Sequence, residues 1–248
     1  MEERDRQRTI LRPVSYSGIG LHSGEELSLT FQPAQPDTGV IFQRVDLPGK
    51  PEVPARIEWV TGTSQATSIG RGGAEVMITE HVLAAIYGLG VDNLLVELDS
   101  SEPPVGDGSP LVFAQLLQKA GIASQGVPRQ YKEIASPVHL IENGVALFAL
   151  PSDSLRISFL IEYEHPMLRS QFASFDIDPE TFLTELAPAR TYCFLDWAQE
   201  LRRKNLVRGG SLENAIVVGP EGILNPTPLR FPNEFVRHKV VDLLGDLA

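Results

Sequence analysis

The sequence predicts an α+β fold built from two structurally similar domains, each of which mixes strands with helices. The chain has 248 residues, a length that suits one large domain or two modest ones. Its 21 glycines and 19 prolines are typical of short elements joined by tight turns. Strand-like segments followed by helix-like segments occur in both halves. The predicted domains are therefore 1–125 and 126–248.

The first half begins with strands and contains two helices. Strands are expected where apolar runs lie between turn residues, at 9–16, 26–31, 39–45, 53–60 and 93–98. A helix is expected at 79–87, because Thr79 is a candidate N-cap and Gly88 and Gly90 stop the pattern. A loop rich in proline and glycine at 101–109 precedes a second helix at 110–119.

The second half follows the best linker candidate, residues 122–130, which contain Ser, Gln, Gly and Pro. Its strands are expected at 138–140, 145–150, 155–163 and 215–218. Its helices are expected at 179–185, 194–204 and 233–247. The order of strands and then helices supports the α+β prediction for this half as well.

Composition excludes several classes of protein. The 32 acidic and 21 basic residues give a net charge of −11, which argues against non-specific nucleic-acid binding. Cys193 is the single cysteine, so there is no intrachain disulfide, as in reducing compartments. No apolar run approaches the roughly 18 residues of a membrane helix, and no signal-type segment follows the charged N-terminus. We expect a cytoplasmic protein without stable membrane insertion.

The predicted helix 233–247 carries a candidate metal site. His238 and Asp242 are four residues apart, so both project from one helix face. A neutral imidazole and a carboxylate in this arrangement can share a divalent metal, usually zinc. Asp246 lies one further turn along that face, and Lys239, about 100° around the helix, can reach a neighbouring anion. The alternative is an ordinary His–Asp pair on a solvated face.

Glu80 directly precedes His81 at the start of the predicted helix 79–87. Consecutive helical residues diverge by about 100°, so His81 can bind a metal while Glu80 reaches the metal's water from the side. Metal-dependent hydrolases need this arrangement. The alternative is a first-turn glutamate beside a half-buried histidine. Two histidines and one aspartate would leave a fourth position for water, the catalytic form of a zinc site.

Two other windows contain candidate residues. His22 lies in a glycine-bounded turn, where glycine permits the backbone angles of a close approach to a ligand. The turn does not have the spacing of a dinucleotide fingerprint. The hydroxyl of Thr191 can hydrogen-bond a polarised carbonyl, although an ordinary threonine at a strand end is the alternative.

These windows, in this order, resemble the zinc-dependent UDP-3-O-acyl-N-acetylglucosamine deacetylase family, which performs the committed step of lipid A synthesis in Gram-negative-type bacteria. The combination of Arg-His-Lys-Val-Val-Asp242 with an upstream Glu-His pair is specific. The matching stretches extend from near residue 9 to the last residue and are Ser17-Gly-Ile-Gly-Leu-His-Ser-Gly24, Thr79-Glu-His81, Gly88-Leu-Gly-Val-Asp-Asn93, Glu102-Pro-Pro-Val-Gly-Asp-Gly-Ser109, Ala189-Arg-Thr191, Ser211-Leu-Glu-Asn-Ala-Ile-Val-Val218, Leu229-Arg-Phe231 and Glu234-Phe-Val-Arg-His-Lys-Val-Val-Asp242.

The resemblance implies layered α+β domains with the active site between them. It implies Zn²⁺ ligands at His81, His238 and Asp242, in agreement with the spacing. Glu80 would be the general acid/base, and Thr191 would stabilise the oxyanion together with zinc.

The resemblance also implies a substrate and the residues that bind it. The substrate is a small molecule, an acylated UDP-sugar, whose N-acetyl group is hydrolysed to release acetate, and the enzyme is expected to be a monomer. Lys239 would meet the diphosphate, and His22 is a secondary substrate-binding candidate. Residues 211–218 resemble the insert that forms an apolar passage for the acyl chain, so Ala215 and Val217 are expected to contact it.

One departure from the family pattern concerns the end of the chain. The family continues past the helix that ends near Gly245 with a Gly-His pair, whose histidine acts at the site and is oriented by the aspartate equivalent to Asp246. This sequence ends at Ala248, so we expect an incomplete C-terminal domain and an Asp246 without that partner. The alternatives are a catalytically weak zinc-binding short form, which binds a nucleotide-sugar lipid or a protein partner without efficient turnover, and a zinc amidase for another N-acyl sugar. Iron could use the same ligands.

Overall fold

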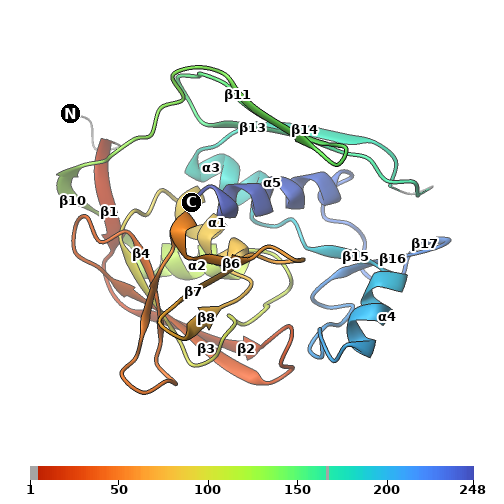
Figure 1. The fold of residues 1–248 in the computed structure, drawn as a ribbon, viewed down its shortest axis with the longest axis horizontal. Helices are drawn as coiled ribbons and strands as arrows, with labels where there is room; N and C mark the ends of the chain where they lie inside the picture. The colour runs from red at the N-terminus through yellow and green to blue at the C-terminus, as the bar shows by residue number, and fades with distance from the viewer. Residues whose placement is uncertain (1–4, 166–167) are drawn as a thin grey trace.

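The computed structural model describes residues 5–165 and 168–248 and confirms the α+β class (Figure 1). Its described strands form small sheets, the largest of which has five strands in the order β2-β3-β9-β4-β5. All neighbours in this sheet are antiparallel except β4 and β9. The elements of the first half are β1 (Arg6–Ile10), β2 (Val14–Ile19), β3 (Glu26–Pro33), β4 (Val40–Arg44), β5 (Glu52–Pro54), η2 (Ile57–Trp59), β6 (Val60–Gly62), β7 (Ser68–Arg71), β8 (Ala74–Val76), α1 (Glu80–Gly88), β9 (Leu94–Leu98), α2 (Leu111–Ala120) and β10 (Ile122–Pro128).

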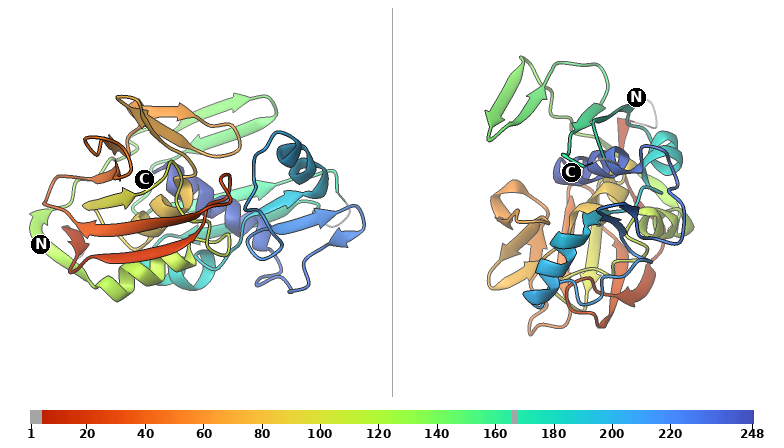
Figure 2. Two further views of the ribbon diagram at one scale, coloured as in Figure 1. Left: turned by 90° about the horizontal axis from the view of Figure 1, so that it is seen from below. Right: turned by 90° about the vertical axis from the view of Figure 1, so that its right-hand side faces the viewer.

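The second half contributes two hairpins, a three-stranded sheet and the long helix α5. The strand pairs β11–β12 and β13–β14 are antiparallel, whereas β15 and β16 are parallel. Its elements are β11 (Val138–Glu142), β12 (Val145–Ala149), β13 (Arg156–Ile161), β14 (Gln171–Asp176), α3 (Pro179–Thr181), the π-helical turn η3 (Phe182–Leu186), β15 (Tyr192–Phe194), α4 (Leu195–Arg203), β16 (Ile216–Gly219), β17 (Gly222–Ile223) and α5 (Glu234–Asp246). Figure 2 shows the β11–β12 hairpin extending away from the body of the molecule.

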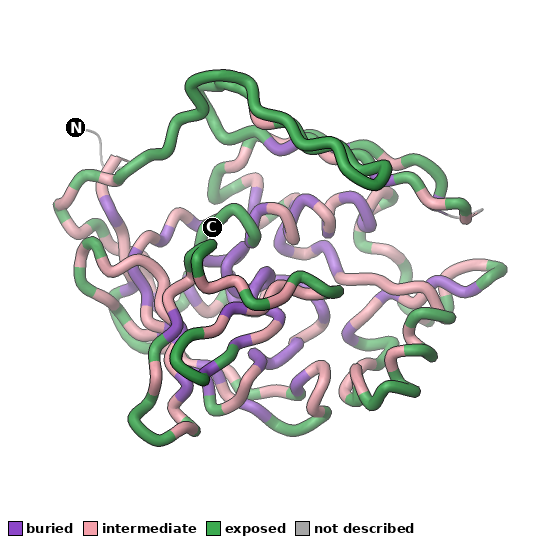
Figure 3. The backbone as a smooth tube through the Cα atoms, viewed as in Figure 1, coloured by how far each residue is buried: buried purple, intermediate pink, exposed green. Residues whose placement is uncertain are grey.

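The core joins the two halves through α1 and α5, which lie side by side (Figure 1). Strand β3 alternates in the usual way, and its buried Leu29 and Phe31 lie in the same cluster as Val240 and Leu244 of α5. Figure 3 shows both helices largely buried and the β11–β12 hairpin exposed. Among the described residues, strand pairing does not connect 5–128 with 138–248. The shared core shows that the halves nevertheless pack as neighbours.

Several predicted elements are confirmed and others are wrong. The predicted helices 79–87, 110–119, 194–204 and 233–247 correspond to α1, α2, α4 and α5. The expected linker at 122–130 is wrong for most of its length, because β10 pairs with β1 and closes the first half. Residues 57–59 of the predicted strand 53–60 form the short helix η2 instead.

The small β6-β7-β8 sheet and β14 were not predicted, since their short segments lack a clear period-two pattern. None of the helices in the described part of the chain combines the length and apolarity that crossing a bilayer requires.

Candidate metal centre

Three predicted ligands converge where α1 meets α5. The Nε2 atoms of His81 and His238 are 3.3 Å apart. Asp242 Oδ1 lies 3.2 Å from His238 Nε2 and 3.6 Å from His81 Nε2. Both histidines are buried, with exposed fractions of 8% and 2%. The three donor atoms therefore lie around one point, and we call these residues the metal triad.

The spacing and chemistry of the triad fit a tetrahedral divalent metal. Zinc–ligand bonds of about 2.0–2.1 Å at tetrahedral angles place the ligand atoms about 3.3–3.4 Å apart. The three observed separations bracket that range. The Nδ1 atom of His238 lies 3.0 Å from the Ala189 carbonyl oxygen, which needs a proton on Nδ1 and leaves the Nε2 lone pair facing the other two ligands. The donor set therefore fits zinc.

The groups around Asp242 keep its carboxylate ionised, as a metal ligand must be. Burial alone would raise the pKa of Asp242, but the two histidines and Lys239 outweigh it and lower the pKa. Lys239 Nζ donates to Asp242 Oδ2 at 2.9 Å. Burial lowers the pKa of His238 to about 4, which keeps it neutral as a metal ligand must be. For His81, Asp242 outweighs burial and raises the pKa, so protons and metal compete for this site.

Glu80 stands beside the triad at the start of α1. Its side chain is largely buried, and burial raises its pKa above the usual value of a glutamate, the direction that favours a role in proton transfer. The backbone N–H of Thr67 donates to Glu80 Oε2 at 3.2 Å. Just before the helix, Ile78 has φ +57°, a left-handed conformation that is unusual for a β-branched residue. The chain is thus turned sharply into the helix that carries Glu80 and His81.

Thr79 does not cap α1 with its side chain, contrary to its predicted role as an N-cap. Its backbone is already helical and its hydroxyl donates to the Thr67 carbonyl oxygen at 3.2 Å. The helix begins at the predicted place, but the hydrogen bond connects it to the β6–β7 loop.

Asp246 lies at the end of α5 and contacts that same loop. The Thr67 hydroxyl donates to Asp246 Oδ1 at 2.7 Å. Burial raises the pKa of Asp246. The helix ends fit closely, since a Cβ at Gly245 would overlap the Glu80 carbonyl oxygen. Sequence reasoning missed Thr67, which has no motif partner nearby in the chain.

Thr191 is anchored by its backbone, and its chain neighbours Ala189 and Tyr192 contact His238. Its N–H donates to the Gly108 carbonyl oxygen at 2.7 Å. Gly108 has φ +80°, and a Cβ there would overlap the Asn214 carbonyl oxygen, so glycine is required. Ala189, two residues before Thr191, accepts the His238 hydrogen bond. The residue between them, Arg190, forms a buried ion pair with Glu234 at 2.9 Å, which the sequence analysis did not identify.

The other predicted substrate residues lie farther along the chain's surface. His22 Nδ1 accepts a hydrogen bond from the Val207 N–H at 3.4 Å. Ala215, just before β16, and Val217 are half-buried and alternate with the buried Ile216 and Val218. No described contact joins His22, Ala215 or Val217 to the metal triad, so their substrate role stays a prediction.

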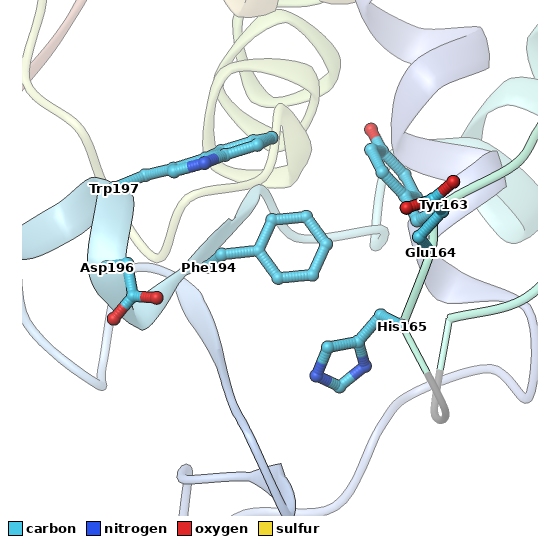
Figure 4. A pocket seen from close by; sticks show the side chains of 6 residues that line it. All are labelled: Tyr163, Glu164, His165, Phe194, Asp196 and Trp197. Carbon is cyan, nitrogen blue, oxygen red and sulfur yellow. The ribbon is translucent and has the colours of Figure 1, made fainter.

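A pocket of about 260 Å³ lies between the segment that follows β13 and the start of α4 (Figure 4). The ring of Phe194 lies 4.7 Å from that of Trp197, 5.2 Å from that of Tyr163 and 5.5 Å from that of His165, measured between centroids. The Tyr163 hydroxyl is 3.0 Å from that of Tyr192, whose ring contacts His238. The lining residues are Tyr163, Glu164, His165, Phe194, Asp196 and Trp197. Sequence reasoning missed this pocket because its aromatic residues come from a loop, a strand and a helix that are separate in the chain.

Comparisons with known proteins show the family of this chain. The family model described as LpxC, UDP-3-O-acyl N-acetylglycosamine deacetylase, matches residues 7–248. UDP-3-O-acyl-N-acetylglucosamine deacetylase from Myxococcus xanthus (strain DK1622) is 44% identical over 98% of this chain and 77% of its own length. The proteins of the same name from Geobacter sp. (strain M21) and Nitratidesulfovibrio vulgaris are 41% and 44% identical over 98% of this chain, and 79% and 78% of theirs. This chain belongs to the UDP-3-O-acyl-N-acetylglucosamine deacetylase family.

Proposed function

We propose that this protein is a zinc-dependent deacetylase that removes the N-acetyl group of UDP-3-O-acyl-N-acetylglucosamine and releases acetate, in lipid A biosynthesis. The observation that carries the proposal is the convergence of the metal triad beside the buried carboxylate of Glu80. The substrate is the one for which the related deacetylases are named. The reaction is amide hydrolysis: water adds to the acetyl carbonyl, the C–N bond breaks, and the amine leaves with a proton.

The metal triad and the residues around it would have separate roles in the hydrolysis. A zinc ion held by the triad would activate water and polarise the acetamide carbonyl. Glu80 would accept the proton of the attacking water and pass it to the leaving amine. The Thr191 hydroxyl would donate a hydrogen bond to the oxygen on which negative charge develops. Asp246, at the C-terminal end of α5, would be a second catalytic carboxylate.

Substrate binding would use the surfaces on either side of the triad. One N–H of the Lys239 ammonium is used by Asp242, and the other two remain for a phosphate oxygen. The aromatic pocket of Figure 4 suits a planar part of the substrate such as its base. His22, Ala215 and Val217 are proposed to line the path of the acyl chain.

The same observations support proposals for the domain boundary, the oligomeric state, the compartment and the partners of the protein. We place the domain boundary between β10 and β11, after the predicted residue 125, because strand pairing in the described residues separates 5–128 from 138–248. One chain supplies all three ligands of the triad, which supports a monomer as the active form. The single cysteine fits a reducing cytoplasm, and the net charge of −11 disfavours nucleic acid as a partner.

The proposal is tested by acetate release from UDP-3-O-acyl-N-acetylglucosamine with the zinc-loaded 248-residue chain. We expect turnover that a chelator removes and that added zinc restores. A zinc-loaded, folded chain without acetate release would contradict the proposal and favour a zinc-binding form that does not turn the substrate over. Equal turnover of an analogue without the acyl chain would favour an amidase for other N-acyl sugars.

Glu80→Gln should lower kcat for acetate release by about 10²-fold or more, since general acid–base groups contribute on the order of 10²–10⁴. Zinc content should stay at that of the wild type, because Glu80 is outside the triad. Metal analysis and acetate assays on the same preparation check both statements. Loss of zinc from the variant would make Glu80 a ligand or a structural residue instead.

A further inference from the structure

Thr67 connects the two carboxylates that flank the metal triad. Its N–H donates to Glu80 Oε2, and its hydroxyl donates to Asp246 Oδ1 at 2.7 Å. Its carbonyl oxygen accepts hydrogen bonds from the N–H and the hydroxyl of Thr79. Every backbone and side-chain polar group of Thr67 is therefore directed to the start of α1 or the end of α5.

The position of Thr67 in the chain makes this arrangement informative. It lies just before β7 of the small β6-β7-β8 sheet, 13 residues from Glu80 and 179 from Asp246. The residue is only half-buried, so replacing its hydroxyl with a methyl group removes little core packing. What such a change removes is the donor to Asp246.

The two carboxylates need such donors. Glu80 is buried directly beside the ligand His81, and Asp246 lies one turn of α5 beyond the ligand Asp242, so each carboxylate stands close to the metal triad. Hydrogen bonds from uncharged donors stabilise carboxylates without adding a charge that would compete with the metal. The N–H of Thr67 donates to Oε2, one of the two carboxylate oxygens of Glu80. One residue thus fixes the direction of two carboxylates that belong to different helices.

We propose that Thr67 is a positioning residue for the deacetylation, which holds the carboxylates of Glu80 and Asp246 in fixed positions relative to each other where α1 meets α5. This inference rests on the proposed function. Hydrogen bonds to charged groups are strong enough for the loss of one to change a rate by about 10- to 100-fold. Thr67 acts on the rate through the two carboxylates and does not bind the metal.

The variants Thr67→Val and Thr67→Ser separate the hydroxyl from the rest of the side chain. Thr67→Val should lower kcat by about 10- to 100-fold, with KM within about twofold and with unchanged zinc content. Thr67→Ser should restore most of kcat. Thr61→Val is the matched control, because Thr61 also donates to a carboxylate, Glu75 Oε1 at 2.9 Å, on the same small sheet. It should retain wild-type kcat. A wild-type kcat in Thr67→Val, or an equal loss in both valine variants, would overturn the proposal.

A double-mutant cycle tests the route of action. In an Asp246→Ala background, Thr67→Val should cause little further loss of kcat, whereas a full multiplicative loss would contradict action through Asp246. The same cycle on the thermal midpoint of the metal-free chain should also be non-additive, and additivity there would overturn the contact itself. Because this second readout needs neither metal nor substrate, a wild type without acetate release would contradict the proposed function alone.

Discussion

Asp242→Ala should lose stoichiometric zinc and lower kcat/KM for acetate release by about 10³-fold or more, the scale of a metal ion's contribution to amide hydrolysis. Asp242 is the charged member of the triad and lies within 3.2 and 3.6 Å of the two histidine Nε2 atoms. Its removal also leaves Lys239 without its ion-pair partner. Metal analysis after dialysis, together with an acetate assay, measures both effects.

The matched control for this variant is Asp178→Ala. Asp178 is an exposed carboxylate that accepts a hydrogen bond from the Thr181 N–H at the start of α3. This control should retain zinc and activity. Zinc retained at one ion per chain in Asp242→Ala would contradict the assignment of this aspartate as a ligand.

Glu234→Gln should destabilise the protein by about 3–5 kcal/mol, the usual cost of removing one partner of a buried ion pair. The Glu234 side chain is 0% exposed. It accepts hydrogen bonds from the Arg190 N–H and guanidinium and from the Arg230 N–H. The neutral amide would leave the buried Arg190 cation without compensation. Urea unfolding at pH 7 measures the loss.

The same pair predicts a pH dependence of stability. Burial alone would raise the pKa of Glu234, but the hydrogen bonds from Arg190 and Arg230 outweigh it, and the pKa is lowered. The stabilisation is therefore complete above the unfolded pKa of about 4.3. It is lost as the pH falls through the folded pKa, so the variant and the wild type should converge in acid.

Glu200→Gln serves as the control for this stability prediction. Glu200 pairs with Lys204 at 2.6 Å, but both side chains are more than half exposed, and such pairs are worth less than about 1 kcal/mol. An equal loss of stability in the two variants would contradict a special role for the buried pair.

The sequence predicted the helices that carry the site, and the structure shows where such reasoning ends. His238 and Asp242 share a helix face, so their spacing alone placed them together. His81 is 157 residues from His238, so no local spacing links the two; they were combined by ligand chemistry and by the resemblance. Thr67 and the Arg190–Glu234 pair were missed because their hydrogen bonds join distant segments and leave no local period. The prediction of a linker at 122–130 was wrong for the same reason, because β10 becomes a strand only through its pairing with β1.

The division of the triad between α1 and α5 has a consequence for folding. The ligands come from distant parts of the chain, so α1 and α5 must pack together before the metal can bind tightly. Such long-range contacts form slowly during folding. A metal that binds only the native state stabilises it by an amount that grows with the logarithm of free metal concentration. The metal would then bind after the two helices have packed and would stabilise the folded protein. Removal of the metal by a chelator would therefore accelerate unfolding as well as stop turnover.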